Sequence, residues 1–325
     1  MRYFLTLLLL IAVCCPVSNA VAGSVVDRVK TRGLVRCGSV ERPGLAHDAG
    51  NGRWAGLDVD ICRAIAAAVL GSPEKIGYNG YETPKQFDAI GNQYDDVYFL
   101  TGLEINDQKL AGKITPGPIV FVESHAVMVP STSPVQHVGE LAGKKICFMI
   151  ASPVERSLNA YFESLRKEWL RNPYSEDVEM NDSYDVQNCD AVAGEITTLA
   201  LTRLNPIKKG MTSRILPETL SAYPVIAATG TGDAQWSAIV AWTVYTLISA
   251  ERQKTKWYDG DAKAMPVYAP ELGLDKDWQH RVISAIGNYS DIFERNLGKE
   301  SWFKLDRGLN ANQAHGGLLL GPFLD

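Results

Sequence analysis

The sequence predicts an α/β protein built from two lobes. Its 325 residues exceed what one typical hydrophobic core holds, since domains average roughly 150 residues. Short apolar segments with strand character alternate with longer segments whose apolar residues recur every three or four positions, as in helices that cover a sheet. Hydrophobic residues make up 46% of the chain and charged residues 21%, so one core for each lobe is well supplied.

The first 22 residues predict a secretory signal peptide. Arg2 is its only charge, Leu5–Cys15 is its apolar core, and Ala20-Val-Ala22 is a small-residue cleavage site. The apolar run is shorter than the roughly 18 residues that a membrane span needs. We therefore expect cleavage near Ala22 and export of the mature chain. A lipoprotein is the weaker alternative, because neither cysteine of this segment follows a convincing lipidation box.

The first lobe is expected to begin with a strand over Leu34–Cys37 and a helix within Trp54–Gly71. Asp58 is placed to cap the free N–H groups of this helix, and Gly71 suits the left-handed turn that ends it. A second helix is expected to start at Thr83-Pro-Lys-Gln86, where Gln86 can complete a capping box. Asp96–Thr101 then predicts the next strand.

A Ser-Thr-Ser-Pro stretch after Pro130 predicts a boundary between the lobes. We expect the first part of lobe 1 over 23–128, lobe 2 over 129–226, and completion of lobe 1 by 227–325, whose apolar faces are too many for a tail. The remaining strands are expected at 119–121, 126–129, 145–149, 190–193 and 225–229, with an extended piece at 215–217. The remaining helices are expected to begin at Ser152 and to cover 196–204, 236–250 (capped by Asp233) and 278–293.

Four cysteines remain after removal of the signal peptide: Cys37, Cys62, Cys147 and Cys189. An even number in an exported chain predicts disulfides, and three pairings are possible. The spacing favours Cys37 with Cys62 and Cys147 with Cys189, because each pair then lies within one lobe. No Cys-x-x-Cys occurs and the five histidines are dispersed, so we expect neither a metal nor a cofactor.

Several stretches resemble one known family. Val35-Arg-Cys-Gly38, the segment Gly56–Gly71, Asp233-x-x-Trp236 and the segments 288–298 and 307–318 resemble the general L-amino-acid-binding proteins that serve bacterial ABC importers. The resemblance implies a type II periplasmic binding protein fold, with the second lobe inserted into the first, a hinge between them, and the ligand in the cleft between lobes. It also implies a periplasmic location, a small-molecule ligand, and an ABC permease of the inner membrane as partner.

Ligands of open α/β sheets bind beyond the carboxyl ends of the strands. In the family, the loop after the Asp-Val strand carries an arginine that grips the ligand's α-carboxylate, and Leu100 occupies that place here. Leucine cannot bind a carboxylate. Thr101, the backbone N–H groups of this loop, and Arg42 of the Pro-Gly loop are candidate replacements. Phe99 is a candidate aromatic wall of the cleft, unless it packs in the core.

The second lobe offers two further candidates. The resemblance places Glu195 where the family has an aspartate that receives the ligand's α-amino group, so a cationic group of the ligand can be met there. Alternatively, Glu195 is an exposed acid near a helix start, where the helix dipole favours it. Ser152 stands in the family's hydroxyl-rich turn, and its alternative role is simply to cap the helix that follows.

Three functions compete. The leading hypothesis is a monomeric solute-binding protein that captures an amino acid or an amino-acid-like molecule, possibly cationic, for an ABC importer. The second is a dehydratase-like periplasmic enzyme with Glu195 as general acid, against which no nucleophile–base pair, metal cluster or nucleotide loop is evident, so we expect no enzyme. The third is a sensor or accessory protein. A net charge of -5 with scattered lysine and arginine argues against nucleic-acid binding.

Overall fold

The computed structural model describes residues 24–105, 112–206, 208, 210–252 and 272–322. Among these, no helix combines the length and the apolar character that crossing a membrane requires. The predicted signal peptide over residues 1–22 lies outside the described residues.

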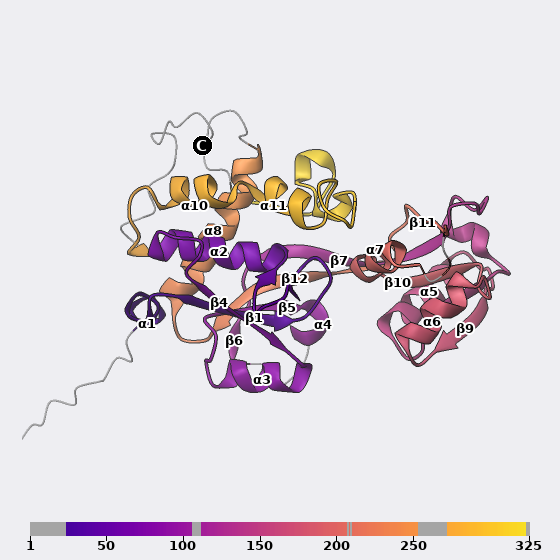
Figure 1. The fold of residues 1–325 in the computed structure, drawn as a ribbon, viewed down its shortest axis with the longest axis horizontal. Helices are drawn as coiled ribbons and strands as arrows, with labels where there is room; N and C mark the ends of the chain where they lie inside the picture. Colours follow the sequence, from indigo (N-terminus) through magenta and orange to yellow (C-terminus); the bar gives the residue numbers. More distant parts are fainter. Residues whose placement is uncertain (1–23, 106–111, 207, 209, 253–271, 323–325) are drawn as a thin grey trace, which may run out of the picture.

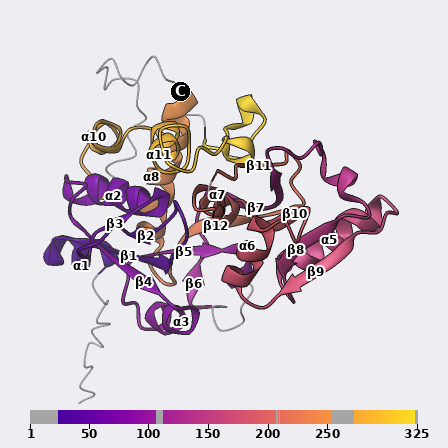
Figure 2. The ribbon, with the colours of Figure 1, turned by 45° about the vertical axis from the view of Figure 1, so that its right-hand side comes forward.

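Two lobes share one mixed sheet, and two long strands carry the chain between them (Figure 1). The sheet order is β4-β1-β5-β12-β7-β10-β8-β9, in which β7 (Ile119–Pro130) and β12 (Ser221–Gly230) run antiparallel across the junction. Lobe 1 combines N-terminal and C-terminal parts of the chain, and the residues between them form lobe 2 (Figures 1 and 2). This confirms the predicted fold class of two lobes, one inserted into the other.

Lobe 1 is a sheet with helices on both faces. Its parallel strands are β4 (Ile76–Tyr81), β1 (Val35–Val40) and β5 (Val97–Thr101). Helix α3 (Thr83–Gly91) lies on one face, and the other face is covered by α2 (Leu57–Leu70), α8 (Ala234–Arg252), α10 (Trp278–Ile286) and α11 (Tyr289–Asn296) (Figure 1). The large buried aromatic side chains of this core include Trp236, Trp278, Tyr289 and Phe293, so the C-terminal helices complete the lobe.

Lobe 2 has a smaller core around β10 (Ala191–Glu195), β8 (Lys145–Met149) and β9 (Leu170–Tyr174). Its helices are α5 (Pro153–Ser164), α6 (Asp177–Asp185) and α7 (Ile196–Leu204). The smaller elements of the chain are α1 (Val25–Arg32), the β2–β3 hairpin (His47–Asp48 with Trp54–Ala55), α4 (Gly102–Ile105), β6 (Ile114–Thr115), η1 (Val138–Leu141), β11 (Ser213–Ile215), η3 (Gly308–Asn310) and η4 (Gln313–His315).

Both predicted disulfides are present. Cys37 of β1 is bonded to Cys62 of α2, with their Cα atoms 6.3 Å apart, and Cys147 of β8 to Cys189 ahead of β10, with their Cα atoms 5.8 Å apart. Each bridge stays within one lobe, so neither restrains movement of one lobe relative to the other.

Several predicted helix ends are confirmed. Gly71 ends α2 in the left-handed conformation with φ 73°, and Ser152 caps α5 by accepting the N–H of Glu155 at 3.2 Å. Asp233 accepts the N–H of Trp236 at 2.8 Å, as expected of the residue that starts α8. The local sequence therefore predicted these three helix ends correctly.

Two predicted caps are wrong. The N-cap of α2 is Gly56, at φ 133°, and Asp58 makes no capping bond but lies fully buried inside the first turn. Only glycine fits at position 56, because a Cβ there would lie 2.1 Å from the carbonyl oxygen of Leu45. At α3 the N-cap is Glu82 without a side-chain bond, so Gln86 completes no capping box.

The single helix predicted over 278–293 is also wrong. The chain turns at Gly287, with φ 84°, and restarts at Asn288, whose side chain accepts the N–H of Asp291 while Asp291 accepts the N–H of Asn288. This capping box separates α10 from α11. The apolar period runs through the break, because Ile286, Tyr289 and Phe293 are all buried in the same core.

Replacing Asn288 by alanine should lower the free energy of unfolding by about 1 kcal/mol, within the roughly 0.5–2 kcal/mol range of lost helix caps. Asn288 is fully buried, so the bond to the Asp291 N–H is not replaced by water. Urea denaturation measures the effect. Asn288→Ser keeps an acceptor and should lose less; equal stability of the alanine variant and the wild type would show that the box does not stabilise the break.

Candidate functional site

Charged side chains gather where strands of the two lobes meet. We define the junction cluster as Arg42, Asp58, Glu104, Glu123, Glu195 and Tyr223, which are connected by ion pairing, hydrogen bonds or charge interactions. Lobe 1 contributes Arg42, Asp58 and Glu104, the crossing strands contribute Glu123 and Tyr223, and lobe 2 contributes Glu195.

Strand register explains why these side chains meet. Tyr223 of β12 is directly opposite Glu123 of β7, and His125 of β7 is opposite Glu195 of β10. Residues directly opposite on antiparallel strands bring their Cβ atoms to roughly 5 Å. Thr101, the last residue of β5, is opposite Val225 of β12, so the carboxyl end of β5 reaches the same crossing strands.

Arg42 and Thr101 are brought together by Glu104. Arg42 stands in the Pro-Gly loop after β1, which closes on itself through the N–H of Arg42 and the carbonyl of Ala46 at 2.8 Å. The Nη2 of Arg42 donates to Oε2 of Glu104 at 2.8 Å. The same oxygen accepts the backbone N–H of Thr101 at 2.7 Å and its hydroxyl at 3.0 Å. Charge-assisted bonds of this kind are the stronger hydrogen bonds of proteins.

Asp58 is the most isolated acid of the junction cluster. Its side chain is fully buried, and within the described part of the chain neither carboxylate oxygen has a hydrogen-bond partner. Burial raises the pKa of Asp58 to about 7, with the Arg42 guanidinium acting against this shift and the Glu104 carboxylate adding to it. Tyr78 faces the same region: its hydroxyl lies 3.0 Å from Oγ of Ser39, and burial followed by the Asp58 charge raises the pKa of Tyr78.

Glu123 is a second fully buried acid. Burial, and then the neighbouring Glu195 carboxylate, raise the pKa of Glu123 to about 7. The hydroxyl of Thr197 donates to it at 2.6 Å, and the N–H of Ser124 at 2.9 Å. These bonds favour the ionised form and oppose the effect of burial.

Glu195 accepts a hydrogen bond from the hydroxyl of Tyr223. Burial and then the Glu195 and Glu123 carboxylates raise the pKa of Tyr223, which stays a neutral donor. The ring of His125 packs edge-on against Tyr223 with centroids 5.6 Å apart, and its Nδ1 lies 2.8 Å from Oγ of Ser157. Burial lowers the pKa of His125, although the Glu195 carboxylate acts in the opposite direction.

Of the six predicted site residues, three lie in or next to the junction cluster and three lie elsewhere. Arg42 and Glu195 belong to the junction cluster, and Thr101 is bonded to it through Glu104. Phe99 is fully buried and stacks on Tyr78 at a centroid distance of 6.4 Å, on the side of the core that includes α2. Leu100 points to the other face of the sheet and is fully buried among apolar side chains. Ser152 caps α5 in lobe 2. Their roles in ligand binding stay predictions.

Glu104, Glu123 and Tyr223 were not predicted as site residues from the sequence. Glu104 had a signal, because Thr101-Gly-Leu-Glu104 has the Thr-x-x-Glu spacing of a capping box, and both reciprocal bonds are present. Glu123 and Tyr223 had none, since their pairing depends on the register of two strands that are 100 residues apart in the chain.

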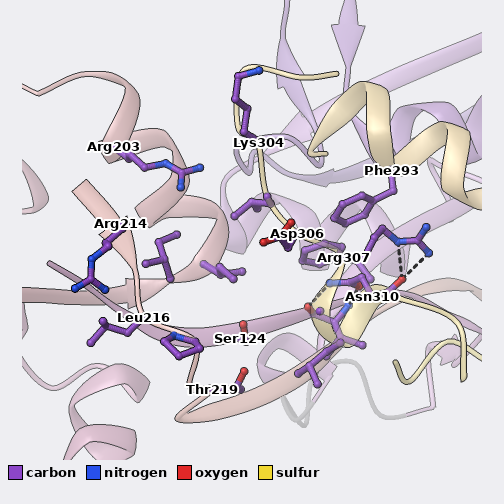
Figure 3. A pocket seen from close by; sticks show the side chains of 18 residues that line it. Ser124, Arg203, Arg214, Leu216, Thr219, Phe293, Lys304, Asp306, Arg307 and Asn310 are labelled. Atoms are coloured by element: carbon purple, nitrogen blue, oxygen red, sulfur yellow. Dashed lines mark hydrogen bonds between the residues drawn. The ribbon is translucent and has the colours of Figure 1, made fainter. Parts of the chain in front are cut away.

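Among cavities lined by described residues, two near the junction contain no residue of the junction cluster in their linings. One of about 380 Å³ separates α7 and β11 of lobe 2 from the C-terminal part of lobe 1 (Figure 3). Its basic side chains already have partners: Arg203 donates to the carbonyl of Phe303, and Arg307 donates to the carbonyl of Asn310 at 2.7 Å. A second cavity, of about 890 Å³, lies between the Pro-Gly loop, α7 and Trp302. Among the described residues no group of three metal-binding side chains is arranged to hold an ion.

Asp58→Asn should stabilise the protein increasingly as the pH rises from about 4 to about 7. An aspartate in the unfolded chain has a pKa near 3.9, whereas burial raises the pKa of folded Asp58 to about 7. Between these values the unfolded state binds fewer protons than the folded state, so wild-type stability declines with pH through this group. Urea denaturation of both proteins from pH 4 to 8 measures the difference. Asp88→Asn, at an exposed aspartate of α3, is the matched control, and a flat difference between Asp58→Asn and wild type would contradict the shift.

Comparison with known proteins gives the family. No family model matches the chain, but curated relatives cover almost all of it. It is 31% identical to the general L-amino acid-binding periplasmic protein AapJ of Rhizobium johnstonii, over 94% of both chains, and 31% identical to the glutamate/glutamine/aspartate/asparagine-binding protein BztA of Rhodobacter capsulatus, over 96% of both. It is 27% identical to the putative amino-acid ABC transporter-binding protein YhdW of Escherichia coli K12, over 94% of both.

A solved structure agrees with these relatives. The periplasmic binding protein of an ABC transporter from Brucella ovis, with glutathione bound, matches with a TM-score of 0.73 and 29% identity, covering 93% of this chain and 99% of that one. The second substrate-binding domain of a putative amino acid ABC transporter from Streptococcus pneumoniae, 12% identical with a TM-score of 0.57, shows the same two-lobed fold. The chain therefore belongs to the family of type II periplasmic binding proteins that serve amino-acid ABC transporters.

Proposed function

We propose that this protein captures a small amine-bearing solute at the junction cluster and delivers it to an ABC permease of the inner membrane. The observation that carries the proposal is the composition of the cluster: the four carboxyl groups of Asp58, Glu104, Glu123 and Glu195 outnumber the one guanidinium, that of Arg42, and burial raises the pKa of Asp58 and of Glu123 to about 7. An ammonium group beside these acids favours their ionised forms and compensates the resulting negative charge, whereas an anion opposes their ionisation.

Glu195 is the proposed anchor for the amine in lobe 2. Its carboxylate accepts a bond from Tyr223 and retains other lone pairs for a cation. Arg42, Thr101 and Glu104 form the proposed lobe 1 side of the site. A solute that contacts both sides favours the closed form, because a ligand shifts an equilibrium only by its differential affinity for the two states.

The crossing strands are the proposed hinge. The expected lobe boundaries, after residues 128 and 226, fall within β7 and β12. Packing supports crossings slightly earlier in the chain. Phe121 belongs to the core of lobe 1 while Ala126 packs with lobe 2, and on the return Leu216 packs with lobe 2 while Val225 packs with lobe 1.

We further propose that the mature chain acts as a periplasmic monomer after cleavage near Ala22 and releases its solute unchanged. The named relatives are binding proteins, which supports binding over the dehydratase-like alternative. Mass spectrometry of the small molecule that is released from protein taken from the periplasm, before and after incubation, tests the last of these points. A chemically altered product after incubation with that molecule would favour the enzyme, and an empty protein would favour the sensor or accessory role.

Glu195→Gln should weaken binding of the co-purified solute by about 2–5 kcal/mol, the usual cost of removing one partner of a buried charge pair. The substitution keeps the shape and a hydrogen-bond acceptor for Tyr223 but removes the charge. Titration calorimetry with the identified solute measures the change. Glu176→Gln, an exposed acid at the start of α6, is the matched control in lobe 2. Unchanged affinity of the Glu195 variant would remove it from the site.

A further inference from the structure

We infer that Glu104 occupies, from within the chain, the place of a ligand carboxylate and so makes the site selective for amines that carry no carboxylate. This inference rests on the proposed function, because it takes the ligand to bind at the junction cluster. Glu104 would then determine whether the protein binds an α-amino acid or the corresponding decarboxylated amine.

The donors around Glu104 are those that a free carboxylate requires. One oxygen, Oε2, receives the Nη2 of Arg42 at 2.8 Å, the backbone N–H of Thr101 at 2.7 Å and the Thr101 hydroxyl at 3.0 Å. The side chains of Arg42 and Glu104 are only 11% and 12% exposed. A guanidinium with a backbone N–H and a hydroxyl is a typical carboxylate-binding set, and here it is already filled.

A capping box accounts for only part of this arrangement. Thr101 and Glu104 do exchange the reciprocal bonds of such a box at the start of α4. Glutamine serves in a capping box as well as glutamate does, however, and the box needs no cation. Arg42 comes from a loop 62 residues earlier in the chain and adds an ionic bond with little exposure to solvent. The charge of Glu104 therefore has a role beyond the helix end.

The surroundings oppose a second carboxylate. A carboxylated ligand would compete with Glu104 for one guanidinium, and it would add a negative charge beside the buried Asp58, whose pKa burial already raises to about 7. Within the described chain, the buried Nη1 of that guanidinium has no hydrogen-bond partner. Like charges at close range disfavour each other strongly in a poorly solvated site. Leu100 supplies no compensating cation, since it is fully buried in an apolar cluster. An amine without a carboxylate avoids this conflict.

Matched ligand pairs test the selectivity. Calorimetry with agmatine against L-arginine, and with cadaverine against L-lysine, compares molecules that differ only in the α-carboxylate. Wild-type protein should bind the amine of at least one pair about 10-fold more tightly than its amino acid or better. Glu104→Ala should raise the affinity for that amino acid by roughly 10- to 100-fold, the range that corresponds to one charge-assisted hydrogen bond. Glu74→Ala, at an exposed glutamate of lobe 1, should leave both affinities unchanged.

Acetate rescue tests the carboxylate place without any assumed solute. In Glu104→Ala the donors of Arg42 and Thr101 lose their partner, so acetate should raise the melting temperature of this variant in a saturable manner. Sodium chloride at equal ionic strength should not do so, and the wild type and Glu104→Gln, whose place is still filled, should respond to neither salt. Equal responses of Glu104→Ala and wild type to acetate would overturn the inference, whether or not the variant is less stable.

The two proposals fail in different ways. If wild-type protein binds the L-amino acids as tightly as the amines, the role of Glu104 is overturned while binding at the junction cluster stands. If it binds neither member of either pair, the amine proposal is overturned for these probes, and the acetate result alone then decides whether Glu104 fills a carboxylate site.

Discussion

The antiparallel pairing of β7 with β12 determines how the two lobes of this protein are placed and which of their side chains meet. These strands exchange a ladder of hydrogen bonds from His125 and Ser221 to Ile119 and Ile226. Strand β5 of lobe 1 pairs with β12, and β10 of lobe 2 pairs with β7, so both lobes are attached to the same ladder. The lobe 1 and lobe 2 parts of the junction cluster meet because β5 and β10 are both paired with strands of this ladder.

Much of the fold follows from local patterns. The strand at Lys145–Met149 and the helix at Ile196–Leu204 have the predicted bounds, since a short apolar run and a helical period were each bounded by clear turn signals. The break at Gly287 was missed because the apolar period continues across it. Strands β4 and β9 were missed because they hardly alternate: most residues of both are partly exposed or exposed.

The candidate site was only partly predicted from the sequence, because several of its residues acquire their role through tertiary packing. Thr101 and Glu195 are the last residues of β5 and β10, and Arg42 follows β1. The edge rule for α/β sheets places residues at these positions near a ligand. Asp58 was read as a cap because its position at a helix start is a local cue, whereas its burial depends on the tertiary packing of lobe 1. Glu123 was missed for the same reason. A glutamate within an apolar strand can be assigned to a site only when its cross-strand neighbour, here Tyr223, is known.

The placement of the two disulfides has a mechanical consequence. Each covalent bridge ties a strand to its own lobe, between Cys37 and Cys62 in one and between Cys147 and Cys189 in the other. Cross-links reduce the freedom of the segments that they enclose, and the crossing strands lie outside both enclosed segments. The disulfides thus stabilise each lobe separately and place no covalent restraint on the crossing strands. Under the proposed function, a permease would therefore recognise the filled protein by the angle between its lobes rather than by a change of shape within either lobe.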